Sequence, residues 1–417
     1  MSNAFVIDNI QTNPLHALLD PQVRPDPYGI HAELRESSPL RVDEGLVIVG
    51  DYRSCLAAMR NPALGSDTLK SSWLKGVLPQ SEAPVLDSIF FMDPPDHPRK
   101  RRLISKAFTP RITARYEPWI QGLVDGAISE IADKDSFDGV RDYANRLSMG
   151  TICELMDLPP SDVPMLKEWS DQLALATELP TLVAAFRNSE MFSAEQLAGF
   201  DRTSMAIHAY FADLIHKRRK KPGEDLISSL IQTEEEGHSL TRHEVTNVLL
   251  NLFAAAHESV TNLISSGMLI LSRYPDQLSL LRDDPSIAPL LVEEVLRYDA
   301  PVHVTARVAL SSTCVGEIDV EPGTIVILLL AAGNRDEAEF PQADRFQGNR
   351  KTKGIGLAFG AGPHFCLGAS LAKLEAEIAL KAFAERLTDF TVDEDSLTYR
   401  PHVVARGLQS MTVRRRP

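Results

Sequence analysis

Cys366 is the residue whose surroundings most clearly indicate chemistry. It lies in the segment FGAGPHFCLGASLAKLE (359–375), a glycine-rich stretch directly before a predicted helix that begins at Ala369. Glycines such as Gly362 allow positive φ angles and let the backbone approach a bulky planar ligand closely. A cysteine at a helix N-terminus has its thiolate stabilised by the helix dipole and by free backbone N–H groups. The pattern therefore indicates a reactive or ligating sulfur.

Three interpretations of this cysteine compete. A buried, inert cysteine is the usual interpretation of a single Cys, but it does not explain the turn-type residues on both sides of Cys366. A Cys/His nucleophile is conceivable because His364 is close, yet two residues apart in a tight loop is a poor geometry for such a pair. The third interpretation is a single thiolate ligand to iron.

Polar residues inside a long apolar segment form a second candidate. Glu258 and Ser259 interrupt the apolar tract 245–273, directly after small residues at 254–256 that leave room for a ligand. Burying polar side chains is costly unless they are hydrogen-bonded or functional. For His257, beside them, we favour a histidine whose hydrogen bonds are satisfied within the helix packing.

Two further pairs share a helical face. His97 and Arg101 are four residues apart and can point at one anionic group. Glu294 and Arg297 are three residues apart and can form an ion pair. In the basic segment around Arg101, the side chains Arg99, Lys100 and Arg102 are expected to be exposed.

The elements that position these residues are mostly helical. Thr241 and Glu244 form a capping-box pattern at the head of an apolar helix that runs to Tyr274 and is ended by Pro275. About 32 residues at roughly 1.5 Å each span roughly 48 Å, enough to cross a whole domain. Strands are predicted over 302–310 and 324–330, and a further helix over 369–387.

These patterns predict a mainly α fold with a small β portion in one domain, 1–417. Its α-rich parts are expected at about 90–300 and 369–388, and its β-rich parts at about 28–60, 302–330 and 390–415.

Composition limits the other possibilities. The formal net charge of -14 makes nucleic acid an improbable main partner. The four cysteines are scattered and form no CxxC pair, which argues against a disulfide framework or a structural zinc site. The first 20 residues lack the pattern of a signal peptide, and no apolar stretch approaches the length of a membrane span. We expect a soluble, cytoplasmic protein.

The cysteine segment resembles the ligand signature of a known family. Phe359-x-x-Gly362-x-His364-x-Cys366-x-Gly368 is similar to the cysteine motif of the cytochrome P-450 family. The resemblance extends over about 90–375 and implies that family's fold, a triangular prism of helices around a long central helix that crosses the haem. It implies haem b as the cofactor, with Cys366 as its metal ligand. The resemblance also implies two groups of haem contacts. The propionates would be bound by His97, Arg101, Arg307 and His364, and the ring would be contacted by Ala255, Phe359, Gly360 and Gly368.

The resemblance also assigns other roles. Glu294 and Arg297 match a structural triad whose third member is Arg350, beyond the F-P-x-x-D-x-F stretch 340–346. Glu258 and Ser259 match the catalytic acid and hydroxyl that relay protons to dioxygen. The sequence departs from the family pattern in having Ser259 for threonine and Ala256 for glycine, and serine lacks the methyl group that restricts its rotamers.

The function implied is a monooxygenase that hydroxylates or epoxidises a mostly apolar, medium-to-large small molecule in secondary metabolism. Dioxygen would be the co-substrate, a separate ferredoxin-type partner would supply electrons, and the enzyme would act as a monomer. The positions expected to line the substrate pocket are Leu249, Phe253, Ala254, Val302 and Val304. Two alternatives remain: a ligand or gas sensor without turnover, and a peroxide-driven peroxygenase on the same fold.

Overall fold

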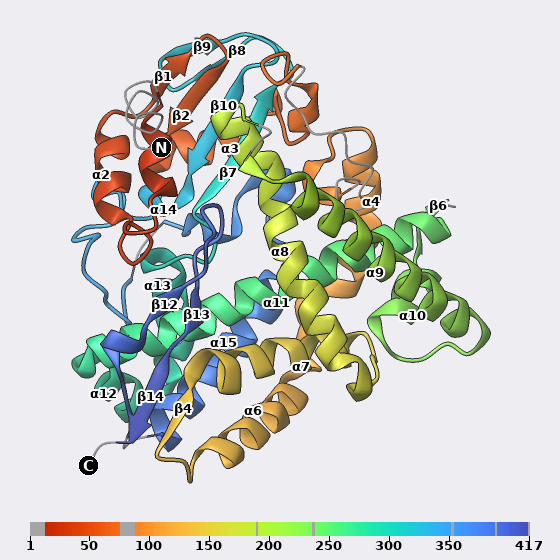
Figure 1. Ribbon diagram of the computed structural model, residues 1–417, viewed down its shortest axis with the longest axis vertical. Helices are drawn as coiled ribbons and strands as arrows, with labels where there is room; N and C mark the ends of the chain where they lie inside the picture. The colour runs from red at the N-terminus through yellow and green to blue at the C-terminus, as the bar shows by residue number, and fades with distance from the viewer. Residues whose placement is uncertain are drawn as a thin grey trace.

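One long helix, α11 (Arg242–Arg273, 32 residues), runs through the middle of the computed structural model (Figure 1). Its capping box is confirmed: Glu244 N donates to Thr241 Oγ1 at 3.2 Å, and Thr241 N donates to Glu244 Oε2 at 2.8 Å. The next helix begins at Pro275. Proline has no N–H to continue the hydrogen bonds of α11, but it fits the first turn of a new helix. The predicted central helix is therefore confirmed, with its start and its end.

The structure describes residues 13–75, 88–188, 191–235, 238–351, 354–387 and 390–415. Residues 1–12, which carry most of the N-terminal pattern considered above, lie outside these ranges.

Other helices surround α11 on both sides. Helices α8 (Val163–Phe186) and α9 (Ala194–Lys220) pack against each other and against α11, while α7 (Asn145–Leu155) and α15 (Ala369–Arg386) also contact it. The remaining helices are α2 (Tyr28–Glu36), α3 (Tyr52–Arg60), α4 (Asp96–Ser105), α5 (Pro110–Ala114), α6 (Glu117–Ile131), α10 (Leu226–Gln232), α12 (Pro275–Asp283), α13 (Ala288–Tyr298) and α14 (Leu330–Gly333). Because α11 has neighbours on most of its sides, most of its residues between 245 and 271 are buried.

The main sheet has five strands in the order β1-β2-β10-β7-β3. They are β1 (Leu40–Asp43), β2 (Leu46–Val49), β3 (Leu64–Gly65), β7 (Val304–Ala309) and β10 (Ile325–Leu329). Strand β10 pairs antiparallel with β7, with Ile327 opposite Ala306, and parallel with β2. The two strands predicted from β-branched runs are confirmed as β7 and β10, each one or two residues shorter at its ends.

Smaller β units lie outside this sheet. The strands are β4 (Ser136–Asp138), β5 (Glu234–Glu235), β6 (His238–Ser239), β8 (Thr313–Val315), β9 (Ile318–Val320), β11 (Phe390–Val392), β12 (Thr398–Tyr399), β13 (Leu408–Ser410) and β14 (Thr412–Arg415). Strand β4 pairs with β14, far away in sequence, and is too short to show strand periodicity. Within 28–60, where we expected mainly β structure, strands occupy only 40–43 and 46–49 and are flanked by α2 and α3.

The mainly α class with a small β portion is confirmed. The sheet and α2 lie at one end of the molecule, and α6, α7 and α15 lie on the other side of α11 (Figure 1). Among the described residues, none of the helices combines the length and the apolar character that a membrane crossing requires.

Candidate active site

The cysteine loop, residues 359–368, is held by its own backbone. Cys366 N donates to Phe359 O at 2.9 Å, and α15 begins at Ala369 with Gly368 as its N-cap. Gly362 has φ +69°, and a Cβ there would lie 2.5 Å from the backbone oxygen of Met59. Only glycine therefore lets the loop pack this closely against α3.

The Cys366 sulfur lies at the N-terminus of α15, as predicted. Burial raises the pKa of its thiol, whereas the backbone N–H groups of Gly368 and Ala369 and the charge of Arg101 lower it. These groups stabilise the thiolate, the form in which cysteine binds a metal. A coordinated metal ion would overcome the effect of burial, because it removes the thiol proton outright.

Four predicted cofactor contacts meet beside this sulfur, from α4, β7 and the cysteine loop. The rings of His97 and His364 stack with their centroids 3.9 Å apart. Arg101 Nη2 donates to a backbone oxygen of the loop at 2.5 Å. Arg307, only 7% exposed, donates to a backbone oxygen of its own strand at 2.7 Å. Burial, together with the charges of His97, Arg307 and Arg101, lowers the pKa of His364 to about 3.

Among the described residues, none with a carboxylate pairs with this cluster of donors. Within the described part of the chain, Arg307 makes no ion pair, and burial lowers its pKa to about 10. The nearest carboxylate that affects its pKa, Asp93, binds Lys70 Nζ at 2.9 Å and accepts from Ser66 N at 2.7 Å. A buried guanidinium is costly without a counter-charge. The residues present therefore fit a large ligand that brings its own carboxylates, as the propionates of haem would.

The face of α11 that remains open is a narrow one. Ala255 is exposed and Ser259 half-buried, although the helix around them is buried, and Ser259 Oγ donates to Ala255 O at 2.7 Å. A helix turns about 100° per residue, which places Leu252, Ala255 and Ser259 on one side. The predicted contact Ala255 and the predicted hydroxyl of Ser259 therefore share this open face.

The five predicted pocket residues do not all reach that face. Phe253 lies on the opposite side of α11, where its ring contacts that of Phe211 on α9, with centroids 6.1 Å apart. Leu249 is also fully buried, and Ala254 and Val304 are 4% and 5% exposed in the same apolar core. Val302 is half-buried and forms an isolated β-bridge with Ala405.

Glu258 points into a polar contact that sequence analysis missed. His402 Nδ1 donates to Glu258 Oε1 at 2.8 Å, and Arg400 Nε lies 3.7 Å from the same oxygen. Glu258 and Ser259 are neighbours in sequence but bind different partners. His402 is 144 positions away from Glu258, and no local pattern connects them.

The hairpin loop, residues 400–407 between β12 and β13, carries His402 and is fixed from a second side. The buried Glu178 of α8 accepts from Ala405 N at 2.7 Å and from Val403 N at 3.2 Å. Burial raises the pKa of Glu178 to about 7. Two carboxylates, one on α8 and one on α11, therefore hold the hairpin loop.

The contact between His402 and Glu258 predicts a pH-dependent stability. Although burial lowers the pKa of His402, the hydrogen bond and charge of Glu258, together with the charge of Glu178, raise it above its ordinary value of 6.5. Burial raises the pKa of Glu258, but His402 and Arg400 lower it below 4.5. The stabilisation from His402 is thus complete below its unfolded pKa and disappears as the pH rises through the folded one.

We expect a double-mutant cycle of His402→Asn and Glu258→Gln to give a coupling free energy of about 1.5–3 kcal/mol near pH 6, the range for hydrogen bonds to charged groups. The coupling should be smaller near pH 9, because the imidazole loses its charge as the pH rises through its folded pKa and then keeps only the hydrogen bond of a neutral N–H group. Urea unfolding of the four proteins at both pH values measures it. A coupling that is equal at both values, or absent at the lower one, would contradict the assigned ion pair.

The prediction for His257 is confirmed, whereas the prediction for Arg99 and Lys100 is not. His257 is fully satisfied, as predicted: Nε2 donates to Asn145 Oδ1 and Nδ1 contacts Ser170 Oγ at 2.8 Å. Arg99 and Lys100 were expected to be exposed, which is wrong. Both reach the carboxylate of Glu244, because α4 lies against the first turn of α11.

The predicted triad is brought together in the core. Glu294 is 2% exposed and accepts from Arg297 Nε at 2.8 Å and from Arg350 Nε at 2.9 Å. Arg297 also donates to the backbone oxygen of Asn334 at 2.9 Å. Asn334 in turn accepts, through Oδ1, the N–H of Leu357 at 2.6 Å. The triad therefore connects α13 to the segment that leads into the cysteine loop.

A cysteine at a helix N-terminus, two arginines beside it and an open face on the central helix are the features expected of a haem site with a thiolate ligand. Comparison with known proteins agrees with this class. The family model for cytochrome P450 matches residues 60–284 and 287–408. The chain therefore belongs to the cytochrome P450 family and is a monooxygenase of that family, which implies a haem cofactor.

Its relatives include bacterial enzymes of known activity. The chain is 34% identical over 399 residues to the vitamin D(3) 25-hydroxylase of Pseudonocardia autotrophica, covering 93% of each protein. It is 31% identical over 408 residues to the 6-deoxyerythronolide B hydroxylase of Saccharopolyspora erythraea, covering 93% of this chain and 96% of the relative. The ligand-free crystal structure of CYP164A2 from Mycobacterium smegmatis superposes with a TM-score of 0.86 at 35% identity, covering 96% of this chain and 99% of that one. The predicted family and fold are confirmed.

Proposed function

We propose that this protein inserts one oxygen atom from dioxygen into a mostly apolar, medium-to-large molecule of secondary metabolism, by hydroxylation or epoxidation. The observation that carries the proposal is the position of the Cys366 sulfur at the N-terminus of α15, beside arginines that pair with no carboxylate among the described residues. Haem b, held by Cys366 and by His97, Arg101, Arg307 and His364, would supply the activation of dioxygen. Phe359, Gly360, Gly368 and Ala255 would contact its ring.

The residues of α11 supply position and protons in this proposal. The Ser259 hydroxyl stands on the open face of the helix, where it can present a proton toward the substrate side. Glu258 is the acidic residue next to Ser259, and the hydrogen bond from His402 keeps its carboxylate ionised and in place. In this role Glu258 takes up protons through the hairpin loop and Ser259 delivers them. Ser259 lacks the rotamer restriction of the family's threonine, so its hydrogen bond to Ala255 O has to orient it.

The substrate class follows from the apolar surroundings of the open face. Leu252 and Ala256 are half-buried there, and Val302 lies next to the hairpin loop. We therefore propose that Leu252, Ala256 and Val302 contact the substrate, with Ala254 and Val304 behind them. By their names, the relatives described above hydroxylate vitamin D(3) and 6-deoxyerythronolide B. A polyketide or terpenoid of similar size fits this proposal.

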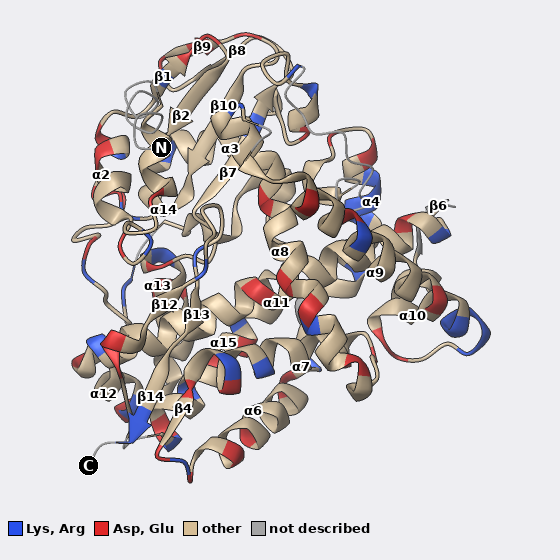
Figure 2. Ribbon diagram, in the orientation of Figure 1, with Lys and Arg blue, Asp and Glu red and all other residues tan. Residues whose placement is uncertain are grey.

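Electrons would come from a separate ferredoxin-type protein that docks near α4. Figure 2 shows lysine and arginine residues gathered on this helix, although the net charge of the chain is -14. Arg102 is exposed there, and Arg99 and Lys100 are half-buried and share the single carboxylate of Glu244. A local positive patch on an acidic protein can steer an acidic partner. The four cysteines form no disulfide, which supports a reducing cytoplasmic setting. We propose that the enzyme acts as a monomer.

Glu258→Gln and Ser259→Ala test the proton-delivery roles. Each change should lower dioxygen-dependent product formation by about a hundredfold, the lower end of the range for a positioned general acid. The measurement is product formed per NADH consumed, with a ferredoxin and its reductase, on a substrate found by spectral screening. The same variants driven by hydrogen peroxide, which brings its own protons, should keep wild-type turnover.

The alternatives give different results in this assay. A sensor would form no product under either oxidant. A peroxygenase would turn over with peroxide alone in the wild-type protein. Equal survival of both activities in the two variants would contradict the proton-delivery assignment.

A further inference from the structure

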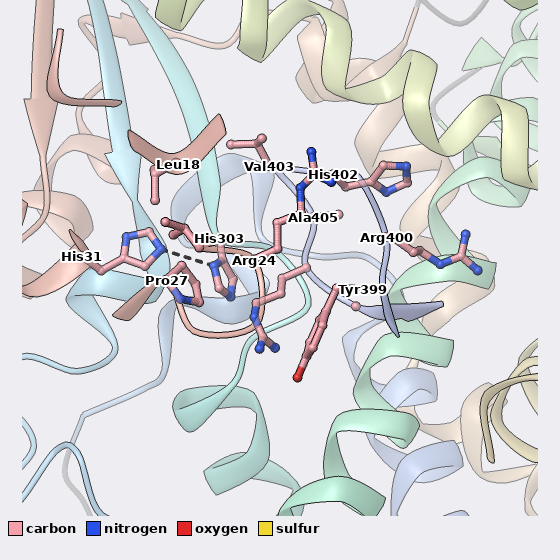
Figure 3. Close-up of a pocket in the computed structure, with 13 residues that line it drawn as sticks. Leu18, Arg24, Pro27, His31, His303, Tyr399, Arg400, His402, Val403 and Ala405 are labelled. Carbon is pink, nitrogen blue, oxygen red and sulfur yellow. Dashed lines mark hydrogen bonds between the residues drawn. The ribbon is translucent and has the colours of Figure 1, made fainter. Parts of the chain in front are cut away.

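A pocket lies on the side of the hairpin loop toward α2, outside the cysteine-loop site (Figure 3). It is narrow and partly open, and the roughly 390 Å³ between its walls includes open solvent. Its walls come from four separate parts of the chain: the N-terminal segment 18–27, His31 of α2, His303 before β7, and residues 399–407. None of the residues proposed to hold the haem lines it.

Unpartnered nitrogen atoms collect in this pocket. Arg24 Nε, His31 Nδ1 and Arg406 Nε are buried and have no hydrogen-bond partner within the described residues. Arg400 Nε likewise has none, although it lies 3.7 Å from Glu258 Oε1. All four residues line the same pocket. Buried donors without a partner are costly, so their gathering around one space indicates a ligand that accepts hydrogen bonds.

The two histidines form a bonded pair in the wall of the pocket. His31 Nε2 and His303 Nδ1 lie 3.3 Å apart, and the rings are 1% and 3% exposed. His303 also has a hydrogen bond to the backbone of Ala300. The donors on which the pocket depends are therefore the guanidinium N–H groups.

The charge around the pocket favours an anion of low charge. Arg24 makes no ion pair in the part of the chain that the structure describes, so its positive charge is available. Arg406 is neutralised by Asp299, whose two oxygens each lie 2.8 Å from Nη1, and Arg400 is close to Glu258. These carboxylates would repel a dianion such as phosphate more strongly than a single carboxylate. Leu18, Val23, Pro27 and Val403 add apolar surface on the other walls.

We propose that this pocket binds the carboxylate group of an amphipathic organic acid, with Arg24 as its main charged contact. The acid's hydrocarbon part would lie along the apolar side chains of Leu18, Val23 and Val403. The guanidinium plane suits a carboxylate, because it can present parallel N–H donors to the two oxygens.

The test is isothermal titration calorimetry of the holoenzyme with octanoate, after an azole inhibitor has saturated the haem face so that binding there is excluded. We expect one octanoate to bind per chain. Arg24→Gln should weaken its binding about tenfold or more, the effect of losing one charge-assisted hydrogen bond. Arg24 lies on a partly exposed loop, and circular dichroism checks that the variant is folded. The matched control is Arg53→Gln, an exposed arginine of α3 outside the pocket, which should bind octanoate as the wild type does.

Inorganic phosphate separates a carboxylate site from a general anion site, and it should bind about tenfold more weakly than octanoate or not at all. No octanoate binding to the wild type would overturn the proposal. Equal affinity in the wild type and Arg24→Gln, or phosphate binding as tight as that of octanoate, would overturn it as well. Because the assay needs no turnover, its failure would leave the proposed monooxygenase reaction untouched.

Discussion

Replacing Cys366 with serine is expected to abolish product formation and leave the helical fold in place. The sulfur lies at the end of α15, where Gly368 and Ala369 N–H groups stabilise a thiolate. A serine hydroxyl stays protonated in this setting and donates far less electron density to iron than a thiolate does. We expect turnover with ferredoxin, reductase and NADH to fall by about three orders of magnitude or more, a barrier increase of roughly 4 kcal/mol.

The matched control is Cys314→Ser. Cys314 is exposed on the short β8–β9 unit, where its thiol contacts Asp319 Oδ1 at 3.0 Å. That variant should retain wild-type turnover and haem content. Turnover by Cys366→Ser at a wild-type rate, with the haem bound, would show that another group ligates the iron.

Removing the Glu294 carboxylate is expected to have the largest effect on stability. In Glu294→Ala the guanidinium groups of Arg297 and Arg350, 3% and 7% exposed, lose their counter-charge. Breaking a buried ion pair in this way typically costs about 3–5 kcal/mol. We expect the midpoint of urea unfolding to fall accordingly, with a large loss of bound haem in the purified protein.

Glu293 provides a neighbouring control. It pairs with Lys373 on the surface, with side chains 46% and 28% exposed. Exposed pairs contribute about 0–1 kcal/mol, so Glu293→Ala should change the unfolding free energy by that amount or less. If the two alanine variants were equally stable, the structural role given to the triad would be wrong.

The haem loss has a structural explanation. Arg297 donates to the backbone oxygen of Asn334, and the Asn334 side chain accepts the N–H of Leu357, two residues before the cysteine loop begins. Removing the Glu294 carboxylate should therefore destabilise the segment that sets the position of Cys366. Glu294→Gln, which keeps the shape and one acceptor oxygen, should lose less haem than Glu294→Ala.

Features encoded in continuous stretches of sequence could be predicted. Helix α11 was predictable because its capping box, apolar periodicity and terminal proline all lie within one segment. The cysteine loop was predictable for the same reason, since Gly362 and Gly368 are spaced around Cys366 in one short motif. Strands β7 and β10 have β-branched runs of ordinary length.

Contacts between distant segments could not be predicted in this way. The hydrogen bond from His402 to Glu258 joins α11 to a hairpin loop near the C-terminus, and Glu178 adds a contact from α8. The pairing of Arg99 with Glu244 depends on how α4 packs against α11. The position of Phe253, in contrast, could have been predicted. Phe253 and Ala255 are separated by an angle of about 160° around the helix, so their side chains lie on different faces of α11.

Ligation of the haem iron by the Cys366 thiolate can be checked with one absorption spectrum. Purified wild-type protein is reduced and exposed to carbon monoxide, and its absorption is recorded against the reduced protein alone. We expect the strongly red-shifted band of a haem that has a sulfur anion as its ligand. A band at the wavelength given by haem proteins with a histidine ligand, in protein that has kept its native fold, would show that Cys366 does not ligate the iron.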